Sequence, residues 1–488
     1  IKIMQIDYSQ FLNMIPEVSL VLLMVIVFVA DFITANKRYR GWLNTLVCAL
    51  LLAHVAFTIS VGVSDSAFGG MYHTTPSISV IKSILAFGTL IVCLQAKEWL
   101  NDENRSKFQG EFYLLVLSTL LGMNVMVSAN HFLLFFLGLE MASVPMACLV
   151  AFDKWKNECA EAGAKFILTA TFSSGVMIYG LSMLYGALGN LYFDNVANNI
   201  TATPLTIAGL VFFFSGLAFK LSLVPFHFWT ADTYQGAPSV VAGYLSVISK
   251  GAAAFAALTI LTKVFANIIT FWHPMLCIII VLSITLANLF AIRQENIKRF
   301  MAFSSISQAG YIMLALLSPS AYATTALSYY VLIYIVANLA VFGIIAVIEN
   351  HDATAVNISD YDGLYKTNPH LSFLMTLALF SLGGIPPFAG MFSKFFIFMA
   401  SLNDYTIDTT MGIVTYVVVF IALVNTVISL YYYLLIVKAM YIKPSEKPIA
   451  KFVSKPETKL ALALCTLGVV LFGIVSGVYT WIYAAALY

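Results

Sequence analysis

Long runs of apolar residues recur along the whole chain, and they limit what it can fold into. A bilayer helix needs about 20 apolar residues, because it rises 1.5 Å per residue through a hydrocarbon core about 30 Å thick. Only 10% of the 488 residues are charged, against about 25% in a soluble domain. Within lipid the backbone must satisfy its own hydrogen bonds, which favours helices. The predicted fold class is an all-α polytopic membrane protein. Its fourteen predicted spans are residues 15–34, 42–62, 77–96, 111–129, 131–151, 162–187, 205–230, 239–262, 272–292, 299–317, 323–349, 370–400, 411–439 and 458–486.

Lysine and arginine are distributed very unevenly between the loops. Loops that follow even-numbered spans carry only Lys263, whereas loops that follow odd-numbered spans carry nineteen basic residues. Short loops rich in Lys and Arg remain on the cytoplasmic side, so we expect the odd-numbered loops there and both termini on the other side. The nineteen residues are Lys37, Arg38, Arg40, Lys97, Arg105, Lys107, Lys154, Lys156, Lys165, Arg293, Lys298, Arg299, Lys366, Lys438, Lys443, Lys447, Lys451, Lys455 and Lys459.

A few ionisable residues lie inside the apolar runs themselves. Lys220, Lys250 and Lys394 are deep within predicted spans, and Glu140 is deep within another. A lysine at the centre of a bilayer helix costs about 3 kcal/mol on insertion scales, and such residues usually mark ion or proton pathways. Lys82 lies near the start of its span, from where its long side chain is expected to snorkel to the interface.

Two of the predicted spans are interrupted by proline. Pro225 breaks the seventh span five residues after Lys220, and Pro386 and Pro387 break the twelfth span shortly before Lys394. The breaks are five spans apart, and an odd separation places the two units in the membrane in opposite senses, as in inverted repeats. We therefore predict two inverted five-helix repeats, spans 4–8 and 9–13. The predicted divisions are a three-helix extension at 1–110, repeats at 111–262 and 272–440, and a C-terminal helix at 458–488.

The alternative for the two breaks is that Pro and Gly merely kink two helices without a role in transport. Broken helices expose backbone polar groups and admit water, which favours a path for protons. Burial disfavours the charged form of a lysine and a nearby carboxylate favours it, so Glu140 and Lys220 can form a pair that takes up and releases a proton. Lys250 and Lys394 would continue the path. A static buried ion pair that fixes helix packing remains the other interpretation of Glu140 and Lys220.

Two further polar residues are candidates for the same path. His227 follows the first break by two residues and could transfer protons at neutral pH. Gln308 lies in an apolar helix, FSSISQAGY, where its amide can hydrogen-bond water but cannot carry charge. The run Tyr431-Tyr432-Tyr433 is either aromatic packing or a set of hydroxyls along a wet path. No phosphate-binding loop, dinucleotide fingerprint, zinc motif or CxxC pair is present, so we expect no metal or redox site in this chain.

Three stretches of the sequence resemble one known family of membrane proteins. They are FKLSLVPFHFWTADTYQGAPSVVAGYLSVISKGAAAFA, IRQENIKRFMAFSSISQAGY and SLGGIPPFAGMFSKF. They resemble the antiporter-like subunits of respiratory complex I, which are similar to cation/proton antiporter subunits of the Mrp type. The residues Ser249-Lys250 and the lysine at 394 favour the subunit N branch. The resemblance covers nearly the whole chain.

The resemblance implies a role for four residues. Glu140 corresponds to the fifth-span glutamate, Lys220 to the seventh-span lysine paired with it, Lys250 to the central eighth-span lysine and Lys394 to the twelfth-span lysine. Members of the family are thought to translocate protons, driven by quinone reduction elsewhere in the complex. Gln308 departs from the pattern, because related sequences often carry histidine there. Water is therefore expected to bridge Lys250 and Lys394.

The resemblance also implies a cellular setting. It indicates a subunit of the proton-pumping NADH:quinone oxidoreductase of the respiratory chain, in a bacterial inner (plasma) membrane with both termini periplasmic. FMN, iron–sulfur clusters and quinone are expected in other subunits, and no cofactor in this chain. Expected partners are other membrane subunits, including paralogous antiporter-like ones, and lipids, but not nucleic acid. Two alternatives remain: an Mrp-type Na⁺ or K⁺/proton antiporter subunit, and a structural membrane subunit that no longer pumps.

Overall fold

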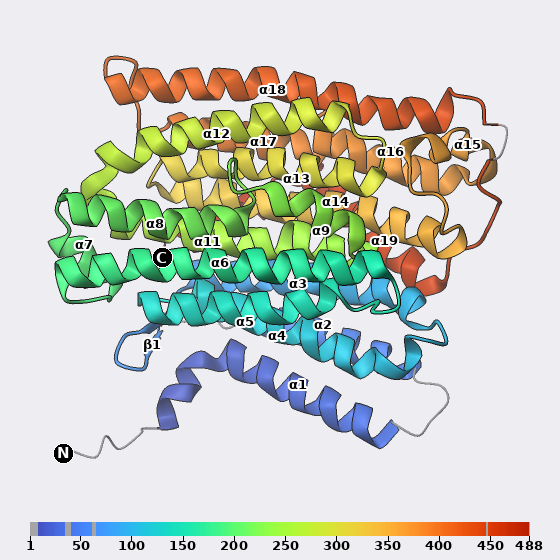
Figure 1. Cartoon of the computed structure of the whole chain (residues 1–488), viewed down its shortest axis with the longest axis horizontal. Coiled ribbons are helices and arrows are strands. Elements are labelled where there is room, and N and C mark those ends of the chain that lie inside the picture. Colours follow the sequence, from blue (N-terminus) through green and yellow to red (C-terminus); the bar gives the residue numbers. More distant parts are fainter. Residues whose placement is uncertain (1–7, 35–40, 61–64, 446–447, 488) are drawn as a thin grey trace.

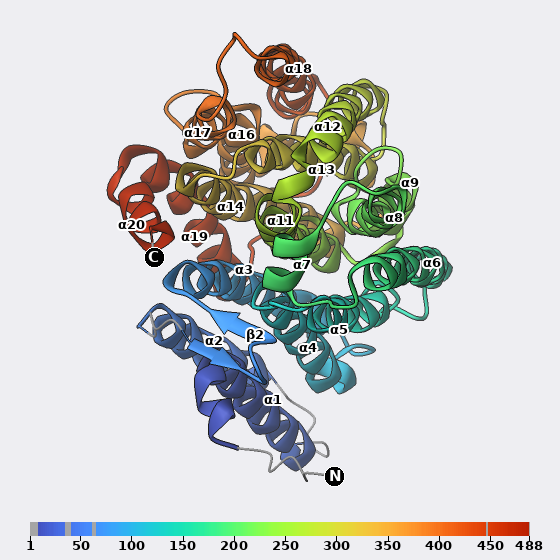
Figure 2. The same cartoon turned by 90° about the vertical axis from the view of Figure 1, so that its left-hand side faces the viewer.

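The computed structural model describes residues 8–34, 41–60, 65–445 and 448–487. Within these ranges the chain is almost entirely helical, and most helices run side by side along one direction (Figure 1). Seen end-on, they form a bundle with α11, α13 and α14 near its middle (Figure 2). The predicted cytoplasmic residues Lys37, Arg38, Arg40 and Lys447 lie outside the described residues.

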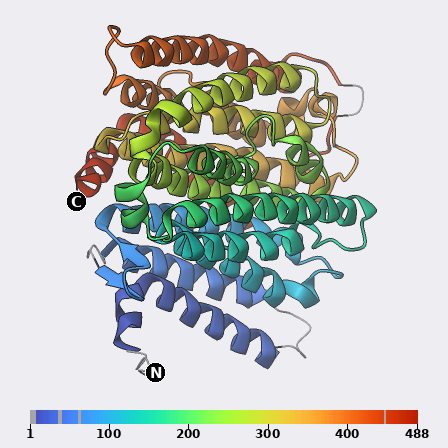
Figure 3. The ribbon, with the colours of Figure 1, turned by 60° about the vertical axis from the view of Figure 1, so that its left-hand side comes forward.

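The first part of the chain, here called the extension, forms three helices: α1 and α2 lie at one edge of the bundle (Figure 2), and α3 packs against both α2 and α14. A two-stranded antiparallel hairpin connects its second and third helices. Figure 3 shows this hairpin at the same end of the bundle as the C-terminal helix α20 (Gly477–Ala486). The sequence patterns did not predict the hairpin. The elements of the extension are η1 (Tyr8–Met14), α1 (Ile15–Thr34), α2 (Gly41–Ser60), β1 (Asp65–Ala67), β2 (Tyr72–Thr74) and α3 (Pro76–Leu100).

The hairpin corrects the interpretation of Lys82. This side chain does not snorkel to a surface: its exposed fraction is 0%. Its ammonium pairs with the carboxylate of Glu17 on α1 at 2.6 Å and donates to the hydroxyl of Tyr72 on β2 at 2.9 Å. Snorkelling requires water close to the helix end, and here the hairpin strand carrying Tyr72 packs against that end instead.

The second part contains the first broken helix. The seventh predicted span is divided into α8 and α9, and the eighth contains two short π-helical segments, Leu245–Ser249 and Ile260–Val264. The other elements between residues 106 and 259 are η2 (Ser106–Phe108), α4 (Gln109–Val127), α5 (Phe132–Val150), α6 (Asn157–Leu188), α7 (Phe193–Asn199), α8 (Pro204–Leu221), α9 (Phe228–Gly236), α10 (Ser239–Tyr244) and α11 (Lys250–Thr259).

The third part contains the second broken helix, whose halves are α16 and α17, and the chain ends in two further helices. The elements from residue 266 onward are η5 (Ala266–Ile268), α12 (Ile269–Ile292), α13 (Ile297–Leu314), η6 (Ala315–Leu317), α14 (Ala321–His351), η7 (Ile358–Tyr361), α15 (Leu364–Thr367), α16 (Pro369–Gly383), α17 (Ala389–Leu402), α18 (Thr410–Tyr441), α19 (Pro456–Ile474) and α20.

The predicted fold class is confirmed. Thirteen helices in the described ranges are long and apolar enough to cross a membrane. The shorter apolar helices α16 and α17 are the two halves of the twelfth predicted span. Both breaks fall where the prolines predicted them. The divisions of the chain at 110, 262 and 440 stay predictions.

The fourteenth span differs from its prediction, because it consists of α19 and α20 rather than one helix. Between them Val475 is extended, with φ −90° and ψ 97°. A Cβ at Gly473, near the end of α19, would lie 2.7 Å from the carbonyl oxygen of Pro387. The missing side chain lets α19 approach the backbone of the second helix break, and Gly and Ser disfavour a continued helix at this point.

The core of the bundle lies around α13 and α14, whose most apolar stretches are wholly buried. Most helices of the bundle pack against other helices on only part of their surface, whereas α13 and α14 are surrounded by other helices. Both nevertheless carry many polar side chains, among them Ser305, Gln308, Tyr330 and Asn338. Buried polar groups require hydrogen-bond partners, so the core contains a polar network rather than a purely apolar one.

Candidate functional site

The first helix break is held together by side chains from neighbouring helices. α8 ends at Leu221, and Ser222 follows in the left-handed region with φ +62°. The amide of Val224 donates to Ser283 Oγ of α12 at 3.0 Å. The indole of Trp229 donates to the carbonyl of Phe219 at 3.1 Å. Backbone groups released by the break are thus satisfied inside the protein, as a broken membrane helix requires.

Lys220 lies in the last turn of α8 and is buried. Its Nζ donates to Ser143 Oγ of α5 at 2.7 Å. Glu140, three residues earlier on α5, accepts a hydrogen bond from Ser174 of α6. Lys220 has no direct ion-pair partner among the described residues. Lys220 of α8 therefore contacts the stretch of α5 that carries Glu140. Its hydrogen-bond partner there is the hydroxyl of Ser143 and not the carboxylate of Glu140.

Lys250 follows directly after the π-helical segment Leu245–Ser249. Only 1% of Lys250 is exposed, and its Nζ donates to Ser305 Oγ of α13 at 2.7 Å. The same nitrogen lies 5.4 Å from the ring centroid of Tyr234 on α9. π-Helical turns inside α-helices occur frequently at functional sites, and this one determines which way the lysine faces.

Lys394 lies on α17, after the second break. Its Nζ is buried without a hydrogen-bond partner in the described part of the chain, 4.8 Å from the ring centroid of Tyr311. A cation over an aromatic face is stabilised by the negative face of the ring. A Cβ at Gly384, the C-cap of α16, would lie 3.3 Å from Cδ of Lys394. Lys394 therefore lies beside the C-terminal end of the broken helix.

Lys220 and Lys394 thus share one arrangement. Each lies beside the C-terminal end of a half-helix, which is the negative end of the helix dipole. That end favours a cation by about 0.3–1 kcal/mol at an exposed site and by more when partly buried. The helix breaks therefore supply partial negative charge to both lysines in the bundle interior.

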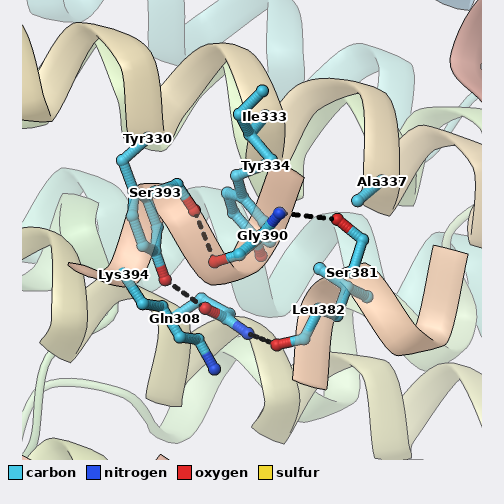
Figure 4. Close-up of a pocket in the computed structure, with 10 residues that line it drawn as sticks. All are labelled: Gln308, Tyr330, Ile333, Tyr334, Ala337, Ser381, Leu382, Gly390, Ser393 and Lys394. Carbon is cyan, nitrogen blue, oxygen red and sulfur yellow. Dashed lines mark hydrogen bonds between the residues drawn. The ribbon is translucent and has the colours of Figure 1, made fainter. Parts of the chain in front are cut away.

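Gln308 connects this second lysine region to the core. Its Nε2 donates to the carbonyl of Leu382 at 3.3 Å and to the hydroxyl of Tyr433 at 3.2 Å. Its Oε1 accepts from the hydroxyl of Tyr330. Figure 4 shows the Gln308 amide beside the Lys394 side chain, around a cavity of about 10 Å³, which is about the size needed for one water molecule.

His227 lies beside the first break but is not joined to the lysines. It is the N-cap residue of α9 and is mostly buried, and its ring stacks on Phe228 with centroids 4.6 Å apart. Its Nδ1 has no hydrogen-bond partner in the described ranges. The role of His227 in the path stays a prediction.

Several residues of the site could not be identified from sequence. Ser143 and Ser305 hold the two lysines, and Tyr330 holds Gln308. Nothing in a single sequence shows which helices will be neighbours, so such serines look like ordinary small helix residues. The tyrosine run gave a usable signal: Tyr433 bonds Gln308, and Tyr432 donates to Asn288 at 3.0 Å, whereas Tyr431 is 56% exposed.

No group of three or more His, Cys, Asp or Glu side chains in the described ranges is arranged to hold a metal ion. The clustered groups are instead amines, hydroxyls and amides. Amines bind and release protons, and hydroxyls and amides hydrogen-bond to them and to water.

Comparison with known proteins places this geometry in a family. A family profile described as "NADH:quinone oxidoreductase/Mrp antiporter, TM" matches residues 129–436. A protein called NADH-quinone oxidoreductase subunit N from Phocaeicola vulgatus is 58% identical over 474 residues, 97% of this chain and 98% of that protein. The protein of the same name from Herminiimonas arsenicoxydans is 35% identical, covering 97% of each chain.

Solved structures agree with the profile. A chain of respiratory complex I from Thermus thermophilus, determined with bound aureothin, superposes with a TM-score of 0.78 at 28% identity, covering 95% of this chain and 97% of that one. A chain of the Mrp complex from a Dietzia species superposes with a TM-score of 0.82, but at 18% identity, which shows a shared fold. The chain belongs to the NADH:quinone oxidoreductase/Mrp antiporter family, in its NADH-quinone oxidoreductase subunit N branch.

Proposed function

We propose that this chain is a proton-translocating membrane subunit of a bacterial NADH-quinone oxidoreductase. The observation that supports this most strongly is the set of three buried lysines, Lys220, Lys250 and Lys394, each beside a helix break or a π-helical segment. Three amines in the interior of a membrane bundle are costly for folding. Their placement where helices are interrupted suits groups that gain and lose a proton.

The proposed path begins at Glu140 and Lys220. Ser143 accepts the lysine's hydrogen bond, so the ammonium form of Lys220 is held toward α5. Movement of charge at Glu140, on the same helix, changes how strongly that form is favoured. Lys220 is the first proton-carrying group, and Lys250, held by Ser305, is the second.

The path continues from Lys250 toward Lys394 past Gln308. Gln308 cannot be protonated at physiological pH, so it does not carry the proton itself. It holds the hydroxyl of Tyr330, which lines the small cavity, and also bonds the hydroxyl of Tyr433. A water molecule in that cavity, together with these hydroxyls, would transfer a proton by accepting one and releasing another. The dipole of α16 and the ring of Tyr311 then favour the ammonium form of Lys394.

We propose that the energy for these transfers comes from redox chemistry in other subunits. FMN, iron–sulfur clusters and quinone would be held there, and no redox centre in this chain. The partners would be neighbouring membrane subunits, among them paralogues of this chain, together with lipids. The uneven distribution of basic residues supports a bacterial inner membrane location with both termini periplasmic.

The alternative is an Mrp-type antiporter subunit that exchanges Na⁺ or K⁺ for protons. The Dietzia structure supports that alternative only through its fold. The 58% identity to a subunit N over nearly the whole chain favours the respiratory enzyme. Copurification of the chain with NADH dehydrogenase subunits, and not with Mrp-type partners, would separate the two.

The test is to replace Lys220 or Lys250 by alanine in the whole complex and measure NADH-driven proton pumping in membrane vesicles. We expect pumping to fall strongly in both variants, with the complex still assembled. Lys366→Ala, at an exposed lysine of an odd-numbered loop, is the matched control and should pump normally. Normal pumping and quinone reduction by the two core variants would refute the proposed function.

A further inference from the structure

We infer that Ser239, Lys298 and Glu349 form the proton-uptake site that supplies Lys250. This inference rests on the proposed function and adds an inlet to it. The ammonium of Lys298 lies 3.4 Å from Oε1 of Glu349 and donates to the carbonyl of Ala237 at 3.2 Å. The hydroxyl of Ser239 donates to Oε2 of the same glutamate.

This cluster lies at one end of the bundle, where three central helices meet. Ser239 begins α10, Lys298 is the second residue of α13, and Glu349 is near the end of α14. It is the end that carries the basic odd-numbered loops, which are predicted to face the cytoplasm. The side chain of Glu349 is 25% exposed and that of Lys298 10%. The carboxylate can therefore exchange protons with water while remaining part of the protein interior.

Helical spacing aligns this cluster with the groups around Lys250. Ser246 follows Ser239 by seven residues, and Ser305 follows Lys298 by seven residues. Seven residues are about two α-helical turns, so Lys298 and Ser305 lie on one face of α13, separated by about 10 Å along the axis, whereas Ser246 lies in the π-helical segment that continues α10. Ser305 Oγ accepts from Lys250 Nζ and donates to the carbonyl of Ser246 at 3.3 Å.

The third helix repeats the pattern. Asn338 precedes Glu349 by eleven residues, which is about three turns and again one helix face. Its Nδ2 donates to Ser246 Oγ. The eighth span, α13 and α14 therefore each contribute one group to the cluster at the surface and one group beside Lys250 in the core.

Some buried polar atoms of α9 and α14, two helices that carry groups near Lys250, lack partners in the described part of the chain. They are Thr233 Oγ1, Tyr234 OH, Tyr334 OH and Asn338 Oδ1. Nearly all buried polar groups are hydrogen-bonded to protein or to water. We therefore expect ordered water between the cluster and Lys250, held by hydroxyl and amide groups of α9 and α14.

A polar cavity lies between α6 and the end of α9, close in sequence to Ala237. It has a volume of about 240 Å³ and is lined mainly by acidic, basic and amide side chains of these two helices, with Gly236 at the end of α9. Gly236 adjoins Ala237, whose carbonyl accepts from Lys298. Water in this cavity would reach the backbone around Ala237, to which Lys298 is hydrogen-bonded. The charged lining residues are Glu158, Glu161, Lys165 and Asp232.

The proposed step moves one proton and no electrons. Glu349 takes a proton from water and its attraction to Lys298 weakens. The carboxyl group then releases the proton into the hydroxyl and water chain, in which each member accepts one proton and passes another on. The neutral amine of Lys250 receives it and becomes ammonium. Glu349 returns to the carboxylate and pairs with Lys298 again, so no charge remains on the intermediate groups.

The experiment compares Glu349→Gln, Glu349→Asp and Glu349→Ala in the assembled complex, using NADH-driven pumping in membrane vesicles. We expect the Gln and Ala variants to pump at least about tenfold more slowly, which is a barrier increase of about 1.4 kcal/mol, and the Asp variant to retain most pumping. Formate or azide should partly restore the Ala variant, because a small weak acid can replace a lost carboxylate. Wild type with the same additive controls for uncoupling.

The matched control is Glu457→Gln, which breaks the Lys97–Glu457 ion pair. That pair has an N–O distance of 2.6 Å and a carboxylate of comparable exposure at 32%, and it joins α3 to α19 rather than the helices that carry Lys250 and Ser305. We expect the control to pump normally. Undiminished pumping by Glu349→Gln would overturn the inlet. A loss of pumping that is relieved neither by a weak acid nor by Glu349→Asp would also overturn it, because such a loss indicates that Glu349 only stabilises the structure.

The Lys250→Ala variant distinguishes the two proposals. If Lys250→Ala abolishes pumping while Glu349→Gln pumps normally, the inlet is wrong and the proposed function stands. If Lys250→Ala itself pumps normally, the proposed function fails. Ser239→Ala provides an independent test of the inlet, since it removes one hydroxyl and leaves both charges. We expect slower pumping from it, and an unchanged rate would contradict the role of the hydroxyl.

Discussion

Lys82 Nζ and Glu17 Oε1 lie 2.6 Å apart in the interior of the three-helix extension, and both residues are almost completely buried. The hydroxyl of Tyr72 donates to the other glutamate oxygen at 2.8 Å and accepts from the lysine at 2.9 Å. One cluster thus joins α1, the hairpin and α3. An ion pair removed from water is weak evidence of added stability, but removing one partner is strongly destabilising.

We predict that Lys82→Met destabilises the extension by about 3–5 kcal/mol, because it leaves the carboxylate of Glu17 buried and unpaired. The double variant Lys82→Met, Glu17→Leu should recover most of this loss. Thermal denaturation of the purified complex measures both. Lys97→Met, which breaks a more exposed ion pair, should cost about 0–1 kcal/mol. Equal destabilisation by Lys82→Met and by the double variant would contradict the prediction.

Ser143→Ala should weaken proton transfer at Lys220. The hydroxyl is the hydrogen-bond acceptor of the buried ammonium, and a hydrogen bond to a charged group contributes about 1.5–3 kcal/mol. We expect pumping to fall by about tenfold or more, since each 1.36 kcal/mol of barrier is a factor of ten. Ser143→Thr keeps the hydroxyl and should retain most activity. Ser215→Ala, at a half-buried serine of α8 bonded only to its own helix, is the control.

Gln308→Leu should interrupt the path between Lys250 and Lys394. It removes the acceptor of Tyr330 and the donor to Tyr433 and places an apolar side chain beside the small cavity. We expect a fall in pumping of about tenfold, equivalent to about 1.4 kcal/mol of barrier. Gln308→His, which keeps a polar and titratable group, should pump well.

The control for Gln308 is Gln95→Leu, another buried glutamine whose Nε2 donates to a carbonyl of α14 at 2.8 Å. It should lower stability without slowing proton transfer. Normal pumping by Gln308→Leu would show that the proton does not pass this residue.

Gly473→Val should disturb the second helix break from outside it. A Cβ at this position would lie 2.7 Å from the oxygen of Pro387 and 2.8 Å from the nitrogen of Ala389, both backbone atoms. Overpacking of this kind costs about 1–3 kcal/mol. We expect a lower denaturation temperature together with impaired pumping, because Lys394 follows the break on α17. Gly175→Val, where a Cβ would contact nothing within 4 Å, is the control.

Features that a short stretch of residues determines by itself could be predicted. A membrane span is a run of apolar residues, a helix break is a proline, and an intramembrane lysine is visible at its position. The breaks at Pro225 and Pro387, the placement of Lys220, Lys250 and Lys394 within spans, and the spans other than the divided fourteenth were accordingly predicted correctly. The roles assigned to these lysines stay predictions.

Features that depend on neighbouring helices could not be predicted. Ser143 is important because α8 packs against α5, and Ser305 because α13 packs beside Lys250. The error at Lys82 has the same origin. Its distance from the helix end was estimated correctly, but a hairpin formed by residues 65–74 packs over that end, and Glu17 lies 65 residues earlier in the chain. The π-helical segments have no proline or glycine signal to reveal them.

The π-helical segment Leu245–Ser249 gives the side chain of Lys250 a way to change its direction. A π-helical turn holds about one residue more than an α-helical turn, and one residue corresponds to about 100° of rotation around the axis. Moving the wide turn past Lys250 would therefore swivel its amine away from Ser305 without lengthening the span or moving its ends. A shift of the π-helical turn along the eighth span would thus rotate the single amine of Lys250 about the helix axis, so that it faces two different compartments in turn.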